Sequence, residues 1–317
     1  MTKEAEYAIK VEKLTKRYGN LTAVNDISFN VRQGEVFALL GPNGAGKTTT
    51  VEIIETFRRP TSGIVHLLGM DVTKEKRNIV PRIGVLPQGF SSFDRITVRE
   101  TMQFYSRLFR CKNADIDGLI DLVNLKDKAK EQYRRLSGGL KQRLGIAIAL
   151  VNDPEVVFLD EPTTGLDPRA RREVWKVLLG LKKKGKTVFL TTHYMEEAEL
   201  LADTVAIIFK GKIIAMDSPV QLMESNADYL ILTLQSVDEK AFDVFGKMGF
   251  EPVLDNHKNL NVRVERTDDI RKILNGMKDA GVPLLSMQVR KPNLEQVFLK
   301  LTGEMLQEGA SEGKEAE

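Results

Sequence analysis

The chain has 317 residues, enough for one large domain and one small one, and its 42% hydrophobic and 29% charged residues are ordinary usage for a protein with a buried core. Its 47 Lys and Arg residues against 44 Asp and Glu residues give a net charge of +3, which is too balanced to predict a nucleic-acid or anionic-membrane surface. The single cysteine, Cys111, excludes an intrachain disulfide framework and a multi-cysteine metal site.

Two kinds of strand are predicted along the first 210 residues. Near the N-terminus, Ile27, Phe29 and Val31 alternate with polar residues, which is typical of an antiparallel strand with one wetter face. Four later segments are instead continuously apolar, which predicts strands buried on both faces in a mostly parallel sheet with helices around it. These segments are Val36–Leu40, Val156–Asp160, Thr187–Leu190 and Val205–Phe209.

A glycine-rich loop, GPNGAGKT, follows the first continuous strand and precedes a helix-like segment. Glycines allow the backbone N–H groups of residues 41–48 to point at phosphate oxygens, and the following helix dipole favours negative charge there. In this pattern Lys47 reaches the β- and γ-phosphates and the Thr48 hydroxyl can ligate Mg²⁺. A simple turn with a solvated lysine is the alternative, and the strand and helix on either side argue against it.

Between about residues 88 and 152 the pattern becomes helical, and the segment LKQRLGIAIALV places Leu140, Leu144, Ala147, Ile148 and Val151 on one apolar stripe. This region is predicted to be a helical subdomain inserted into the α/β core.

Two carboxylates end the strand VVFLDEP. Asp160 is placed to hold Mg²⁺, and Glu161 is placed to orient and deprotonate a water molecule. An acidic turn after a core strand is the alternative, which the phosphate loop in the same chain makes less favourable.

A second unit is predicted after residue 222. Its order of elements, βαββαβ followed by a helix, indicates a small α+β ferredoxin-like domain over residues 223–303. Residues 304–317 are small, polar and acidic, and we expect them to be disordered.

These motifs together resemble the nucleotide-binding subunit of an ABC (ATP-binding cassette) transporter, over roughly residues 7–222. LSGGLKQR resembles the family signature motif, and GLD at Gly165–Asp167 resembles its D-loop. The resemblance implies a phosphate-loop NTPase fold in which ATP is bound with Mg²⁺ and hydrolysed. The fifth signature position is Leu140 where the family commonly has Gln, and leucine cannot donate a hydrogen bond there.

The resemblance also assigns roles to residues. It makes Glu161, His193 and Gln88 catalytic and predicts Thr48, Gln88 and Asp160 as Mg²⁺ ligands. The nucleotide-binding residues that it implies are Tyr18, against adenine, and Asn43, Gly44, Gly46, Lys47, Thr48, Thr49, Ser137 and Gly139.

The resemblance implies a head-to-tail dimer, in which Ser137 and Gly139 of each chain close over the other chain's ATP. Because this chain has one phosphate loop and one signature, it would pair with a copy or a paralogue. The chain has no stretch of 18 apolar residues, so a separate integral-membrane permease is also implied. We expect a cytoplasmic protein that is peripheral to the membrane through this permease.

The permease is expected to dock on the helical region, with Phe90, Phe93 and Ile96 beside Arg95 and Arg99 as candidate contacts. The C-terminal unit and the run THYMEEAELLADTVAII resemble the ABC-2 type, daunorubicin-resistance exporter branch, so export is the favoured activity. An importer cassette with a regulatory C-terminal domain is the alternative, followed by a soluble ABC ATPase without a transport role. For the C-terminal unit itself, a dimerisation or regulatory role is favoured over simple bracing.

Overall fold

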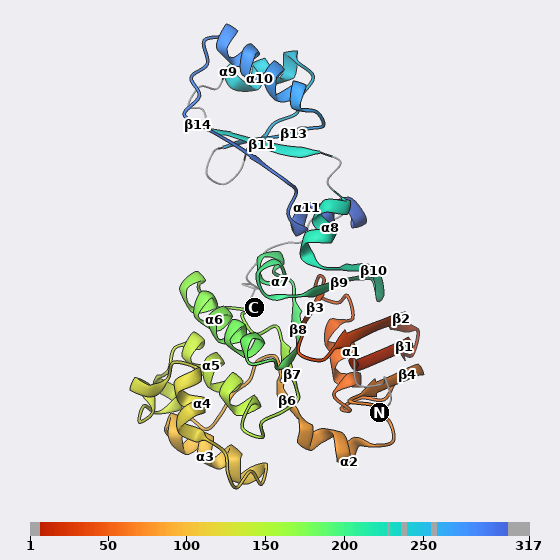
Figure 1. Ribbon diagram of the computed structural model, residues 1–317, viewed down its shortest axis with the longest axis vertical. Coiled ribbons are helices and arrows are strands. Elements are labelled where there is room, and N and C mark those ends of the chain that lie inside the picture. The colour runs from red at the N-terminus through yellow and green to blue at the C-terminus, as the bar shows by residue number, and fades with distance from the viewer. Residues whose placement is uncertain (1–6, 227–228, 236–239, 255–258, 304–317) are drawn as a thin grey trace, which may run out of the picture. The chain divides into compact units, whose positions relative to one another are not determined.

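The computed structural model describes residues 7–226, 229–235, 240–254 and 259–303 (Figure 1). They divide into two compact units, the first ending at Pro219 and the second beginning at Val220. The tail expected over residues 304–317 lies outside the described residues.

A six-stranded sheet forms the centre of the first unit, in the order β10-β9-β3-β8-β7-β6. Every neighbouring pair is parallel except β9 and β10. β3, β7 and β8 are buried at every residue, which confirms the mostly parallel sheet predicted from continuous apolar runs. The strands are β3 (Val36–Leu40), β6 (Ile83–Leu86), β7 (Val156–Asp160), β8 (Thr187–Thr192), β9 (Thr204–Phe209) and β10 (Lys212–Asp217).

A second, antiparallel sheet packs in the order β2-β1-β4-β5. In β2, Ile27, Phe29 and Val31 are buried while the residues between them are exposed, as the alternation predicted. Phe29 stacks on Phe37 of the central sheet with ring centroids 5.1 Å apart, and Phe37 lies 5.2 Å from Phe189, so the two sheets share one core. The strands are β1 (Tyr7–Tyr18), β2 (Leu21–Arg32), β4 (Ser62–Leu67) and β5 (Met70–Asp71).

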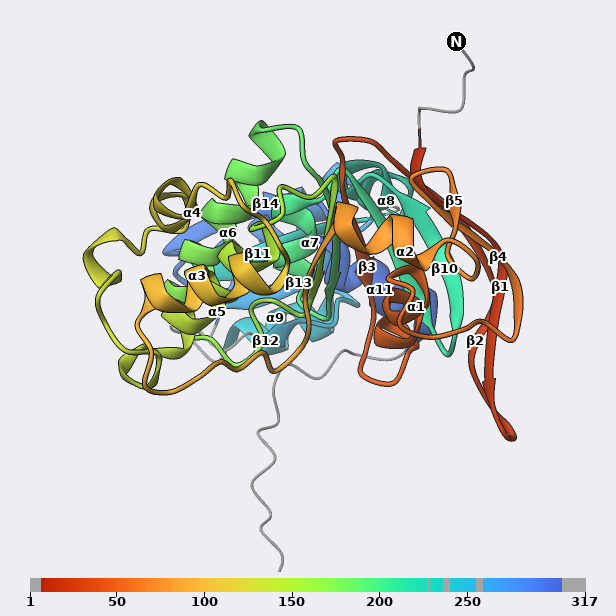
Figure 2. The same ribbon diagram turned by 90° about the horizontal axis from the view of Figure 1, so that it is seen from below.

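The helices α3, α4 and α5 gather on the side of the central sheet away from the antiparallel sheet (Figures 1 and 2). From Leu144 to Ala149, α5 is buried on all sides, a wider burial than the single stripe predicted from sequence. The helices of this unit are α1 (Lys47–Ile54), α2 (Lys76–Ile79), α3 (Val98–Leu108), α4 (Ile116–Leu122), α5 (Gly138–Ala149), α6 (Pro168–Lys183) and α7 (Met195–Leu201). Short 3₁₀ turns lie at Val80–Arg82, Lys126–Lys128 and Tyr133–Arg135.

The second unit is built on a four-stranded antiparallel sheet in the order β12-β13-β11-β14. Its chain order, β11-α9-β12-β13-α10-β14-α11, is the ferredoxin-like arrangement predicted. Leu232 and Val262 of the sheet share a separate core with Phe245 of α9 and Ile273 of α10. The elements are β11 (Leu230–Gln235), β12 (Val253–Leu254), β13 (Leu260–Val264), β14 (Ser286–Arg290), α9 (Lys240–Lys247), α10 (Thr267–Asp279) and α11 (Leu294–Thr302), preceded by α8 (Pro219–Ser225). Over the described ranges of both units, none of the helices combines the length and apolar character that a membrane span requires.

Candidate functional site

The phosphate loop lies between β3 and α1, the context that its sequence pattern requires. Gly46 caps the N-terminus of α1 with φ of 104°, a conformation that L side chains rarely adopt. A Cβ atom at Gly46 would lie only 2.4 Å from the carbonyl oxygen of Ala23, so the loop cannot accept a larger residue here. Gly44 also has a positive φ, 77°. The conformation of this loop therefore requires glycine at position 46 and favours it at position 44.

Lys47 is only 4% exposed, and its ammonium lies inside this loop. The Nζ atom donates hydrogen bonds to the carbonyl oxygens of Gly41 and Pro42, at 2.8 and 3.1 Å. It also forms an ion pair with Glu161, Nζ to Oε1, at 3.0 Å. A buried ammonium needs such partners, because removing an unpaired charge from water costs on the order of several kcal/mol.

Asp160, the last residue of β7, lies beside Thr48, the second residue of α1. Its Oδ2 accepts a hydrogen bond from Thr48 Oγ1 at 3.1 Å, and Oδ1 accepts one from the hydroxyl of Thr191. Burial raises the pKa of Asp160, while these two hydrogen bonds act in the opposite direction. A carboxylate and a hydroxyl side by side are the oxygen donors that Mg²⁺ prefers, so these side chains fit the predicted metal site.

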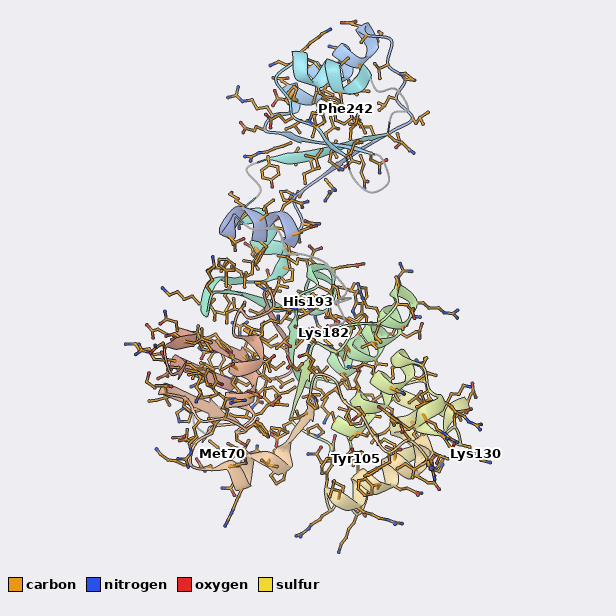
Figure 3. All side chains as sticks on the ribbon, turned by 180° about the vertical axis from the view of Figure 1, so that it is seen from behind. Met70, Tyr105, Lys130, Lys182, His193 and Phe242 are labelled. Carbon is orange, nitrogen blue, oxygen red and sulfur yellow. The ribbon has the colours of Figure 1, made fainter. Side chains whose placement is uncertain are left out.

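Glu161 brings the predicted catalytic residues together. Its Oε2 accepts hydrogen bonds from Gln88 Nε2 at 3.2 Å and from Thr164 Oγ1 at 3.1 Å. His193, labelled in Figure 3, directly follows β8. Its Nδ1 lies 3.3 Å from the same oxygen of Glu161. Burial acts to raise the pKa of Glu161, but its contacts with His193 and with the Lys47 ammonium outweigh burial and lower the pKa to about 2. Glu161 is therefore ionised in this state of the site.

A cavity of about 490 Å³ opens over these groups, within the range of small-molecule sites. It is lined by most of the predicted nucleotide-binding residues: Tyr18, Asn43, Gly44, Gly46, Lys47, Thr48 and Thr49, together with Gln88 and Glu161. Leu21 and Ala23 also line it. Neither residue was predicted from sequence, because only their closeness to Tyr18 in the chain could have indicated them.

Tyr18, the last residue of β1, lines this cavity and has two cations near its ring. Lys16 Nζ is 5.1 Å and Arg58 Cζ is 5.5 Å from the ring centroid. Tyr18 is thus placed for a stacking ligand, and two cations lie beside that position.

Ser137 and Gly139 are the predicted nucleotide-binding residues that are absent from the cavity lining. Ser137 caps α5, and its Oγ accepts a hydrogen bond from Leu140 N at 3.4 Å. Gly139 packs against α6, where an added Cβ atom would lie 2.6 Å from Ala170 Cβ. Within one chain, therefore, the signature residues stand apart from the phosphate loop.

Comparison with known proteins gives a family and close relatives. The ABC transporter family profile matches residues 24–164. The Nod factor export ATP-binding protein I of Burkholderia orbicola is 39% identical over 95% of this chain and 98% of its own length. The daunorubicin resistance ATP-binding protein DrrA3 of Streptomyces coeruleorubidus is 35% identical over 95% of this chain and 97% of its own length.

Solved structures match about two thirds of the chain. The protein cbiO1 from Clostridium perfringens, described as part of the ABC transporter complex cbiONQ, has a TM-score of 0.61 at 28% identity, covering 69% of this chain and 91% of its own. An ATP-binding cassette solved as a dimer in a post-hydrolysis state with ADP and Pi has a TM-score of 0.59 at 26% identity, covering 66% of this chain and 98% of its own.

Proposed function

The chain belongs to the ATP-binding cassette family of ABC transporter subunits, which bind and hydrolyse ATP. On that premise we propose that it powers export through a separate membrane permease and that Glu161 is the general base of ATP hydrolysis. The observation that supports this proposal is that Glu161 contacts Lys47, Gln88 and His193 beside the cavity bounded by the phosphate loop.

The mechanism begins with an exchange of partners at Lys47. The carbonyl oxygens of Gly41 and Pro42 hold the Lys47 ammonium inside the phosphate loop. When nucleotide phosphates enter the loop, their oxygens compete with Glu161 for this ammonium. Glu161 then loses its cation and becomes a better acceptor for the proton of a water. As the water oxygen bonds to the γ-phosphorus, the bond to the β-phosphate oxygen breaks, and ADP and phosphate result.

Gln88 and His193 orient the carboxylate through their contacts with Oε2. Thr48 and Asp160 would hold Mg²⁺, with Gln88 as a third ligand, and the ion would neutralise charge on the phosphates.

The site is completed by another chain in this proposal. Ser137 is the N-cap of the twelve-residue helix α5, whose first N–H groups have no partner within the helix and form the positive end of its dipole. These groups suit the γ-phosphate of a nucleotide bound by a partner chain. ATP would then hold two chains together, and hydrolysis would release them, because the γ-phosphate contacts exist in only one of the two states.

The test is Glu161→Gln, which keeps the shape of the side chain and removes its basicity. We expect turnover to fall by about a hundredfold or more, the usual loss for a general base, and we expect light scattering to show a dimer at saturating ATP and Mg²⁺. The matched control adds Ser137→Ala, which should weaken the dimer while ATP binding to the monomer is retained. A Glu161→Gln chain that stays monomeric under these conditions contradicts the proposal.

Export is supported by the two relatives named above, which match this chain almost end to end and are themselves export and resistance subunits. The importer alternative is therefore not favoured. The transported compound would be selected by the permease, so the names of these relatives suggest the direction of transport and not its cargo.

We propose that the permease docks in an apolar groove of about 670 Å³ in the first unit, a size typical of a binding groove. Phe57, which is 75% exposed, Val80, Leu108 and Phe109 supply its apolar lining, and Glu55 is its carboxyl group. Exposed apolar side chains grouped in this way indicate an interaction surface.

Of the contacts predicted from sequence, Phe90 is linked to this groove through Tyr105, whose ring centroid lies 5.8 Å from that of Phe109. Their role in docking stays a proposal. Phe93 is 55% exposed and packs edge-on against Phe104, whereas Phe90 is half-buried near Tyr105. The occupant that fits is an apolar cytoplasmic helix of the permease, which would also hold this subunit at the membrane.

A further inference from the structure

One fully buried carboxyl group lies outside the cavity, on the helix that follows His193. Glu197 of α7 is 0% exposed. Its Oε1 accepts hydrogen bonds from Thr163 Oγ1 at 2.9 Å and from Trp175 Nε1 at 3.0 Å. These residues come from three segments, namely the turn after β7, helix α6 and helix α7. A single carboxyl group therefore joins three elements in the interior.

Burial of the Glu197 carboxyl group carries a desolvation penalty. Burial raises the pKa of Glu197, and the hydrogen bonds from Thr163 and Trp175 only oppose that effect. The cation whose charge acts on Glu197 is Arg171, and it forms no ion pair with the Glu197 carboxyl group. The Arg171 guanidinium lies 4.0 Å from the ring centroid of Tyr194. Both Arg171 Nε and Glu197 Oε2 are buried without a hydrogen-bond partner. An apolar residue would fill the same space without the desolvation penalty.

The elements that Glu197 joins are those that carry the catalytic pair. Thr163 lies two residues after Glu161, in the turn whose Thr164 donates to the Glu161 carboxylate. Helix α7, which carries Glu197, begins two residues after His193. A shift of either segment would change the 3.3 Å separation between His193 Nδ1 and Glu161 Oε2. Small misplacements of this kind can cost as much as about a hundredfold in rate.

We propose that Glu197 is a positioning residue, which fixes the alignment of His193 with Glu161 through its hydrogen bonds to Thr163 and Trp175. The inference rests on the proposed function, because it assumes that Glu161 and His193 act on ATP. Glu197 itself does not touch the cavity, so its effect belongs in the rate of hydrolysis and not in nucleotide affinity.

The experiment compares Glu197→Leu, which removes both hydrogen bonds, with Glu197→Gln, whose amide oxygen can still accept them. For Glu197→Leu we expect kcat for ATP hydrolysis to fall by about tenfold or more while KM changes by less than about twofold. For Glu197→Gln we expect kcat to return to near the original value. Glu196→Leu, at an exposed position of the same helix, is the matched control and should leave kcat unchanged.

Trp175 supplies an independent signal, because it is the only tryptophan in the chain. Loss of the indole hydrogen bond in Glu197→Leu should shift its fluorescence maximum, and Glu197→Gln should restore it. If Glu197→Leu does not fold, Thr163→Val removes one hydrogen bond at nearly constant volume and should lower kcat in the same selective way.

Two results would overturn the inference: an unchanged kcat in both Glu197→Leu and Thr163→Val, or a loss that Glu197→Gln does not reverse. If Glu161→Gln abolishes hydrolysis in the same assay, the proposed function stands while the role of Glu197 fails. If Glu161→Gln retains hydrolysis, the proposed function fails first.

Discussion

At the scale of single residues, Lys47 is held by loop carbonyls close to it in the chain and by Glu161 far from it in the chain. The glycine-rich pattern identifies it as a phosphate-binding lysine, because the spacing and flanking elements are local features. Its ion pair with Glu161 joins residues 114 positions apart, and only the parallel pairing of β3, β8 and β7 brings them together. The cavity residues Leu21 and Ala23 were missed for a different reason, since apolar side chains carry no local signal of a ligand.

Glu55 in the apolar groove gives a prediction about pH. Burial, followed by the negative charges of Asp160 and Glu52, raises its pKa to about 8 from the ordinary value of 4.5. Below pH 4.5 this carboxyl group is protonated in both the folded and the unfolded chain. Between pH 4.5 and about 8 the folded chain retains a proton that the unfolded chain has released. The free energy of unfolding should therefore fall as pH rises through this window, by at most about 1.4 kcal/mol per pH unit.

Glu55→Gln removes the titrating group, so its melting temperature should depend less on pH than that of the original chain. At pH 8 we expect the variant to be more stable by a few degrees, as about 1 kcal/mol raises Tm by 2–4 °C in a domain of this size. Calorimetry from pH 6 to pH 8.5 measures this difference. Glu196→Gln, at an exposed position, is the control for the change of charge. Parallel pH profiles for Glu55→Gln and the original chain would contradict the prediction.

At the scale of elements, the sequence predicted strands well where the signal is a continuous apolar run. β3 was predicted with the bounds that are observed, and β8 extends two residues beyond the predicted end at Leu190. The burial of α5 on all sides was not predicted, because it depends on how closely β6 and α6 approach this helix. Such approach distances are set by the tertiary packing of residues far apart in the chain.

Gly84 in β6 marks the closest of these approaches. A Cβ atom there would lie 1.9 Å from the carbonyl oxygen of Ala149 at the end of α5. Because the obstacle is backbone, Gly84→Ala must displace the helix, and we expect a loss of about 3 kcal/mol or more of stability, the range of severe core substitutions. Gly180→Ala in α6 is the matched control, since its Cβ would meet nothing within 4 Å.

The control should have the opposite sign. Replacing glycine by alanine inside a helix stabilises it by about 0.5–1 kcal/mol when the new methyl group has room. Denaturant titration of both variants measures the two effects together. Equal destabilisation by Gly84→Ala and Gly180→Ala would show that close packing of α5 on β6 is not the cause.

At the scale of the whole molecule, the division into two units with separate cores bears on how the active pair forms. The core of the first unit includes Phe37, Phe158 and Phe189, and that of the second includes Phe245. Several apolar side chains of the second unit are exposed: Val253 and Leu254 of β12, Met287 of β14, and Leu285 just before β14. Apolar residues exposed at sheet edges are candidate contacts with a second copy. We therefore propose that the second unit assists dimerisation, as was favoured over bracing from sequence.

A chain ending at Pro219 tests this role. It should keep the phosphate loop, Glu161 and ATP binding, because these lie in the first unit with its own core. In a Glu161→Gln background, its ATP-dependent dimer should dissociate more readily by about tenfold or more, since a second pair of linked contacts acts through effective concentration. The Hill coefficient for ATP hydrolysis by the truncated chain with Glu161 intact should fall toward one. An unchanged dimer constant and Hill coefficient would leave the second unit with a bracing role only.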